Sequence, residues 1–258
     1  MLYAARVLHS RSLALLSLVA LMLLGAPRAR AQDASDEDLY APPTGSRPTS
    51  GEASLLSGRT LGVGEVMLGA ALGWPGLWAH LELAPSSDLN IGVRGGVVYG
   101  SPVMGLITGA GGELSVPIRI HVFGEGDIDV AVRVAPVLAL GEGRLFGESQ
   151  AGIFAADLGI ASHLDVGARM AFRAVEHFTI FFGLDVGAGF SVIPDQGRPR
   201  PLGLFTAAFG VEALMTRDTM LFGEIQGGVG VSEPGTGGVA VYPQQEILRV
   251  ALGLAYLL

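Results

Sequence analysis

The chain has 258 residues, among them 39 Gly and no Cys, and all 16 of its basic residues are Arg. Its 24 acidic residues give a formal net charge of −8, which excludes nucleic acid as a partner because phosphate binding needs a basic surface. The apolar fraction of 50% excludes disorder over most of the length, and the lack of Cys excludes disulfides, a thiol nucleophile and a cysteine zinc site.

The first 31 residues have the order of a secretory signal peptide. A basic start from Arg6 to Arg11 precedes an apolar run over residues 13–26, and an Ala-Arg-Ala sequence ends at Ala31. This run is shorter than the roughly 20 apolar residues that a transmembrane helix needs. We therefore predict a signal peptide over residues 1–31 that is cleaved after Ala31.

Residues 32–58 form the next segment, which is acidic at first and then rich in Pro, Ser, Thr and Gly. It shows no periodicity, and this composition is typical of disordered chain. We predict an exposed, disordered leader over residues 32–58. The alternative is a tail that binds a partner or the cell wall.

From residue 59 onward, large apolar residues alternate with small or polar ones. The last twelve residues place large apolar side chains at even positions from Leu248 to Leu258, and small or polar residues at odd positions from Arg249 to Ala255. Successive side chains of a strand point to opposite faces, so this period of two indicates strands rather than helices. The ten predicted strands are 60–74, 77–84, 89–100, 112–123, 127–139, 152–172, 177–192, 203–215, 219–231 and 247–258.

The two faces of these strands distinguish between the possible all-β folds. One face is bulky and apolar, and the other is mostly Gly, Ala and Ser with one or two charges per strand. The second face would be a poor coat against water, but it suits the lining of a narrow barrel that crosses lipid. We predict an all-β fold over residues 59–258, a closed antiparallel transmembrane β-barrel of about ten strands, with eight or twelve as alternatives. A soluble secreted β-sandwich is the competing fold.

The end of the chain carries a resemblance to a known class. Tyr256 lies third from the end, and Leu254, Leu252 and Val250 precede it at alternate positions. Over residues 59–258 the chain resembles the bacterial outer-membrane β-barrel proteins, although we assign no specific family. The resemblance implies export to the periplasm of a Gram-negative bacterium and insertion into the outer membrane. It also implies outer-membrane lipid as a partner, the barrel-assembly machinery as a partner during biogenesis, both termini in the periplasm and the long loops outside.

Aromatic and charged residues follow the same parity. Aromatic side chains on the apolar face lie near the strand ends, as expected where a barrel crosses the two membrane interfaces. The predicted interface aromatics are Trp74, Tyr99, Phe154, Phe172, Phe178, Phe190, Phe205 and Tyr256. Charged residues of the strands fall on the other face, which avoids a cost of about 2–4 kcal/mol for a charge at the lipid midplane. The predicted lumen-lining charged residues are Glu65, Glu82, Arg94, Glu113, Arg119, Asp129, Arg133, Asp157, His163, Asp165, Arg169, Asp185, Glu212, Glu224 and Arg249, and His80 and His121 share their face.

These interior charges allow two main interpretations. In the first, networks of Arg and carboxylate groups fill a narrow barrel, and the protein is non-enzymatic with a structural or interaction role at the cell envelope. In the second, they line a narrow diffusion channel for small solutes, with a mild preference for cations because the interior acids outnumber the interior Arg residues.

A barrel enzyme that acts on lipid or peptide is the third interpretation. His80 and Glu82 share a strand face, as do His163 and Asp165, and Asp157 lies close to the second pair in sequence. Such pairs arise readily where all polar residues share one face, and no Gly-x-Ser-x-Gly motif or spacing of metal ligands accompanies them. We therefore predict no catalytic residues, no metal and no cofactor.

Overall fold

The computed structural model of the chain describes residues 54–100, 108–142, 158–175, 177–192, 199–232 and 244–258. No helix in these ranges is long and apolar enough to cross a membrane. The predicted signal peptide, residues 32–53 of the predicted leader, and the site residues Asp157 and Phe154 lie outside the described residues.

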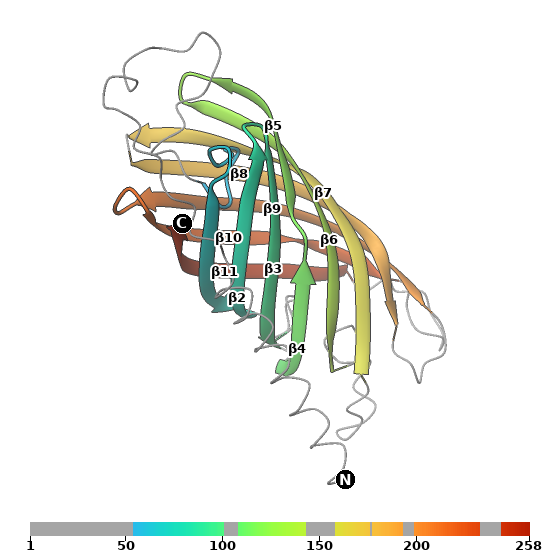
Figure 1. Cartoon of the computed structure of the whole chain (residues 1–258). Coiled ribbons are helices and arrows are strands. Elements are labelled where there is room, and N and C mark those ends of the chain that lie inside the picture. Colours follow the sequence, from blue (N-terminus) through green and yellow to red (C-terminus); the bar gives the residue numbers. More distant parts are fainter. Residues whose placement is uncertain (1–53, 101–107, 143–157, 176, 193–198, 233–243) are drawn as a thin grey trace, which may run out of the picture. The chain divides into compact units, whose positions relative to one another are not determined.

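All of the regular structure in the described ranges belongs to one antiparallel sheet (Figure 1). Its strands are β1 (Val66–Trp74), β2 (Gly76–Ser86), β3 (Leu89–Gly100), β4 (Thr108–Ser115), β5 (Ile118–Glu125), β6 (Ile128–Glu142), β7 (Leu158–Val175), β8 (Phe178–Val192), β9 (Arg200–Leu214), β10 (Thr219–Ser232) and β11 (Gln244–Leu257).

The sheet closes on itself. Strand β1 pairs with β2 on one side and with β11 on the other, so the first and last strands form the closing seam. Strands β4 and β5 both lie between β3 and β6, and together they fill one position in the ring. The prediction of a closed antiparallel ten-stranded barrel is confirmed.

The interruption between β4 and β5 corrects the prediction of one unbroken strand over residues 112–123. It falls at Val116 and Pro117, because proline has no N–H to donate to a sheet ladder. The wall stays connected there, since the Val116 N–H donates to the Pro136 carbonyl (3.1 Å) and the Pro117 carbonyl accepts from the Gly92 N–H (2.8 Å).

The first strand is shorter than predicted, because it begins at Val66 rather than at residue 60. The residues before it form a turn, in which the Glu65 N–H donates to the Gly62 carbonyl (3.0 Å) and Gly64 has a φ of 82°. A positive φ is readily adopted only by glycine and cannot belong to a strand. The chain therefore changes direction before it enters the barrel wall.

The two faces of the wall differ as the alternation predicts. Large apolar side chains point outward, and many stay about half exposed, as Leu254 (57%) and Val186 (57%) do. Inward positions hold small residues such as Ala131 and Ala135, both fully buried, together with charged residues.

The connections define two ends of the barrel. At the end that we call the short-turn end, few residues join β2 to β3, β5 to β6, β7 to β8 and β9 to β10. At the opposite end, the long-loop end, longer stretches join β3 to β4, β6 to β7, β8 to β9 and β10 to β11. The short-turn half and the long-loop half of the lumen are named for the nearer end.

Candidate functional site

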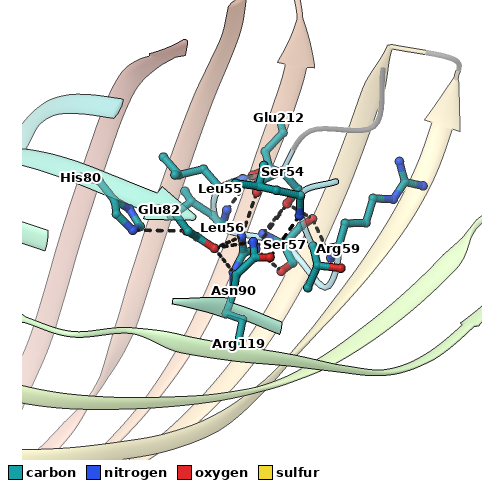
Figure 2. Close-up of polar contacts among 12 residues, drawn as sticks. Ser54, Leu55, Leu56, Ser57, Arg59, His80, Glu82, Asn90, Arg119 and Glu212 are labelled. Atoms are coloured by element: carbon teal, nitrogen blue, oxygen red, sulfur yellow. Dashed lines mark hydrogen bonds and ion pairs between the residues drawn. The ribbon is translucent and has the colours of Figure 1, made fainter. Parts of the chain in front are cut away.

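The short-turn half of the lumen is occupied by the chain itself. Residues 54–61, which we call the lumen segment, lie inside the barrel, and Figure 2 shows the polar contacts of Ser54 to Arg59 with the strands around them. Leu55, Ser57 and Leu61 are almost completely buried. Residues 54–58 are the end of the predicted leader, and here they are packed rather than exposed.

Arg119 of β5 holds the lumen segment through its backbone. Its guanidinium donates to the carbonyls of Ser54 and Ser57, both at 2.8 Å. The same guanidinium forms an ion pair with Glu82 of β2, whose carboxylate also accepts from the Asn90 amide (2.6 Å). These groups are almost fully buried, so the segment completes a hydrogen-bonded network that water does not reach.

Two further carboxylates fix the lumen segment from other strands. Glu212 of β9 accepts from the N–H groups of Leu55 (2.9 Å) and Leu56 (2.7 Å). Asp129 of β6 accepts from the Arg59 guanidinium (2.7 Å) on one oxygen, and its other oxygen lies 3.1 Å from His121. Inward charges that the alternation placed on one face therefore bind this segment from several sides.

An apolar cluster packs against the same segment. Leu55 and Leu61 meet Met67 of β1, Met220 and Phe222 of β10 and the methyl groups of Ala84 and Ala255. Burying a Leu side chain is worth about 1.5–3 kcal/mol, so the cluster stabilises the segment in addition to its polar contacts.

The long-loop half holds a cavity of about 120 Å³ instead. Arg249 of β11 reaches Glu113 of β4 (3.0 Å) across it. Asp185 of β8 also lines it, and both Asp185 oxygens accept from Arg169 on the adjacent strand β7, which lies nearer the short-turn end beside Ala131.

His163 and Asp165, both on β7, also line this cavity. His163 Nε2 lies 3.4 Å from Asp165 Oδ1. The other predicted His–carboxylate pair, His80 and Glu82, lies 3.3 Å apart beside the lumen segment. The two pairs therefore fall in different halves of the lumen.

The described lumen-lining residues divide by burial. Those that are almost fully buried are Glu82, Arg119, Asp129, Arg169, Asp185 and Glu212. Those that keep some exposure are Glu65, Arg94, Glu113, Arg133, His163, Asp165, Glu224 and Arg249. Arg94 stacks over the ring of the inward-facing Trp78 at 5.0 Å from its centre.

The predicted interface aromatics sit toward the two ends of the strands. Trp74 and Tyr99 pack edge to face, 5.9 Å between ring centres, near the long-loop end. Phe190 and Phe205 lie toward the same end and are about half exposed, whereas Phe172, Phe178 and Tyr256 lie near the short-turn end. Phe182 and Phe209 pair in mid-strand (5.2 Å), so outward aromatics are not confined to the strand ends.

Sequence reasoning did not place the lumen segment. Ser54, Leu55, Ser57 and Arg59 lie among small polar residues that resemble a linker, and they have no alternation. The signal that it missed is the pair of adjacent leucines followed by an Arg in a segment otherwise poor in large side chains.

Glu65 lies outside the strands, in the turn before β1. Its carboxylate accepts from the Gly62 N–H (2.6 Å), but partial burial outweighs that bond and raises the pKa of Glu65 above its usual value. Within the described ranges no group of three or more His, Asp or Glu residues is arranged to hold a metal ion.

No protein-family model and no curated protein sequence matches the chain. Among solved structures, it is similar to a loop L8 deletion mutant of OmpT, an outer membrane protein of Vibrio cholerae, with a TM-score of 0.32 and 11% identity over 71% of this chain. The chain spans 53% of the length of that protein.

Two other similar structures are matched over nearly their whole length. The NanC porin has a TM-score of 0.34 at 8% identity, covering 74% of this chain and 98% of the porin. A major outer membrane protein from Thermus thermophilus has a TM-score of 0.30 at 13% identity, covering 75% of this chain and 98% of that protein. These likenesses are to outer-membrane β-barrels, and the fold stated above rests on the strand pairing of this chain.

Proposed function

We propose that the chain is an integral outer-membrane barrel protein without enzymatic activity, closed to solute flow by its own lumen segment, with a structural or binding role at the cell envelope. The observation that carries this proposal is the position of the lumen segment inside the short-turn half. In this proposal the barrel is surrounded by outer-membrane lipid, and the barrel-assembly machinery is its partner during insertion.

The outward face of the barrel supports the membrane location. Soluble proteins rarely expose contiguous apolar patches larger than a few hundred square ångströms, whereas outward apolar side chains here recur on strands all around the ring. A closed ring also leaves no free sheet edge in lipid. The test is cell fractionation together with gel mobility in SDS. We expect membrane recovery and a mobility difference between unheated and boiled protein, whereas a soluble periplasmic protein without that difference would contradict the location.

Contacts from many strands support the closure of the lumen by the lumen segment. The polar anchors Asn90, Arg119, Asp129 and Glu212 come from β3, β5, β6 and β9, and the apolar cluster adds β1, β2, β10 and β11. A segment held from these positions crosses the lumen rather than lying along one wall. An ion would have to displace it to pass.

The conductance of single barrels in a planar bilayer tests whether the lumen segment blocks the passage of ions. We expect the refolded chain without residues 1–31 to be silent, and a variant in which residues 54–61 are replaced by eight Gly and Ser residues to give discrete steps. Both proteins must show the same heat-dependent gel mobility, which checks that the barrel has formed. Steps from the unaltered chain, with a reversal potential that favours K⁺ over Cl⁻, would instead establish the narrow cation-preferring channel.

The hydrogen-bond partners of the polar groups in the lumen support a non-enzymatic role. A hydrolase needs a hydroxyl within hydrogen-bond reach of a base. Ser191 and Thr206 line the same cavity as His163, but no hydrogen bond joins His163 to a hydroxyl among the described residues. Hydrolysis of phospholipid or peptide by the refolded protein that disappears in His163→Ala would contradict this part of the proposal.

A further inference from the structure

The cavity in the long-loop half has one wall with three ionisable groups and an opposite wall that combines apolar and polar side chains. Glu113, His163 and Asp165 belong to the first wall, on β4 and β7. The second wall, on β9 to β11, consists of Leu202, Leu204 and Ile247 together with Thr206, Gln226 and Arg249. Sites for small molecules commonly combine a mainly apolar lining with a few well-placed polar groups.

One row of residues joins the two walls directly. Asp165 of β7 pairs with Gly187 of β8, and Gly187 pairs with Leu204 of β9. A side chain at Gly187 would run into the Asp165 carboxylate on one side and would lie 3.1 Å from Leu204 on the other. The glycine therefore lets the Asp165 carboxylate and the Leu204 side chain approach each other over the backbone of β8, so that a carboxylate lies beside a leucine in the cavity lining.

Asp165 is the lining carboxylate without an Arg partner. Glu113 is paired with Arg249 (3.0 Å), and Asp185 is paired with Arg169 (2.6 Å) and lies 3.5 Å from Arg133. Among the described residues, the ion-pair contact of Asp165 is with His163, at 3.4 Å. Arg133 and Arg249 attract Asp165 from beyond ion-pair distance, and each is in contact with another carboxylate.

Asp165 is the carboxylate that an added cation could pair with in this space. Glu113 is already paired with Arg249, and Asp185 with Arg169 and Arg133. The Asp165 side chain is 19% exposed, so a positive group that reaches it would interact in a partly dehydrated site, where charge-assisted hydrogen bonds are strong.

We propose that this cavity is a binding site for a small amphipathic amine. Its ammonium group bonds to the Asp165 carboxylate, and its hydrocarbon part lies in the cavity against Leu204 and Leu202. The ligand is a free solute rather than a membrane lipid, because the cavity lies inside a closed wall of strands that separates it from the bilayer. The inference adds a ligand to the proposed function and rests on the barrel being closed below the cavity.

Three probes with the same six-carbon chain test the charge preference, namely hexylammonium, 1-hexanol and hexanoate. Each is titrated calorimetrically into the refolded chain in detergent micelles, and the heat of titration into empty micelles is subtracted. We expect hexylammonium to bind about tenfold more tightly than 1-hexanol, as one charge-assisted hydrogen bond implies, and hexanoate to bind most weakly. Equal affinities, or no heat above that of empty micelles for any probe, would overturn the proposal.

Two variants locate the site. Asp165→Asn keeps the shape of the side chain and should bring hexylammonium within about twofold of 1-hexanol. The matched control Asp218→Asn, in the exposed turn after β9, should leave the tenfold preference unchanged. A preference that survives Asp165→Asn would overturn the assignment.

In Gly187→Val the new side chain collides with the Asp165 carboxylate and Leu204 and pushes both toward the cavity. It should abolish binding of both hexylammonium and 1-hexanol, so it tests the position independently if Asp165→Asn fails to fold. Binding that persists in a folded Gly187→Val barrel would also overturn the site. Conductance tests whether the lumen segment closes the barrel, and calorimetry tests whether the cavity binds an amine. A failure of the proposed function is therefore distinguishable from a failure of the proposed binding site.

Discussion

The two halves of the lumen share the same strands and the same kinds of inward residues, yet one is filled and the other is hollow. In the short-turn half, Arg119 and Glu212 bond to backbone groups of the lumen segment. In the long-loop half, Arg249 and Glu113 bond to each other across a cavity. Charges on the inner face of a barrel therefore do not by themselves determine whether the lumen is open or filled. The outcome depends on whether they bond to a chain segment inside the lumen or to one another.

The largest contrast is expected between two arginines. Arg119→Ala leaves Glu82 buried without its cation and frees two carbonyls of the lumen segment, which should cost about 3–5 kcal/mol. Arg249→Ala should cost clearly less, because the Arg249 side chain is 24% exposed and water can replace it beside Glu113. Denaturant unfolding of the barrel in micelles, followed by tryptophan fluorescence, measures both. Equal losses would contradict the difference between the halves.

Two leucines provide the next contrast. Leu55→Ala removes a fully buried side chain from the apolar cluster and should cost about 2–5 kcal/mol. Leu204→Ala enlarges a cavity that already exists, so the loss should be smaller. The same unfolding measurement compares them, and a larger loss for Leu204→Ala would show that the long-loop half is the better packed one.

Two inward alanines test for spare room directly. Ala131 is completely buried beside the short-turn end, and Ala131→Leu should overpack it at a cost of about 1–3 kcal/mol. Ala161 lines the cavity, and Ala161→Leu should leave the free energy of unfolding almost unchanged. The yield of heat-resistant folded barrel on a gel gives an independent measure. If Ala161→Leu is as damaging as Ala131→Leu, the cavity has no usable space.

The smallest expected effect is a pH dependence at Glu65. Because its pKa is raised in the folded protein, folding favours the protonated carboxyl. Its contribution to stability is complete below the usual pKa of Glu and is lost as pH rises through the raised value. Glu65→Gln should therefore flatten a slight decrease in stability with rising pH. Unfolding curves of the two proteins, measured from below the usual pKa of Glu to above the raised pKa, test this prediction. A free energy of unfolding that falls more steeply with pH in Glu65→Gln than in the unaltered chain would contradict the sign.

The barrel itself was predictable from the sequence, because alternation with a period of two is a local signal that each strand carries independently. The last strand shows this most clearly, since Leu252 and Leu254 face outward and Ala251 and Ala255 face inward as predicted. The break at Pro117 was visible as a residue that cannot donate to the ladder, yet alternation continues across it and suggested one strand.

The filling of the site was not predictable in the same way. Alternation places Glu82, Arg119 and Glu212 on the inner face but does not say what they contact. Glu212 and Leu55 are separated by 157 positions in the sequence, and their contact depends on how the whole ring closes. The lumen segment has no period of its own, so its position follows from tertiary contacts that no local pattern encodes.

The lumen segment lies close in sequence to the closing seam of the ring. Only residues 62–65 separate Leu61 from β1, and β1 is the strand that pairs with β11 to complete the ring. The lumen segment is thus joined by four residues to one edge of the seam that closes the ring. The position of the segment inside the barrel and the position of the closing strand are therefore linked by a short covalent connection.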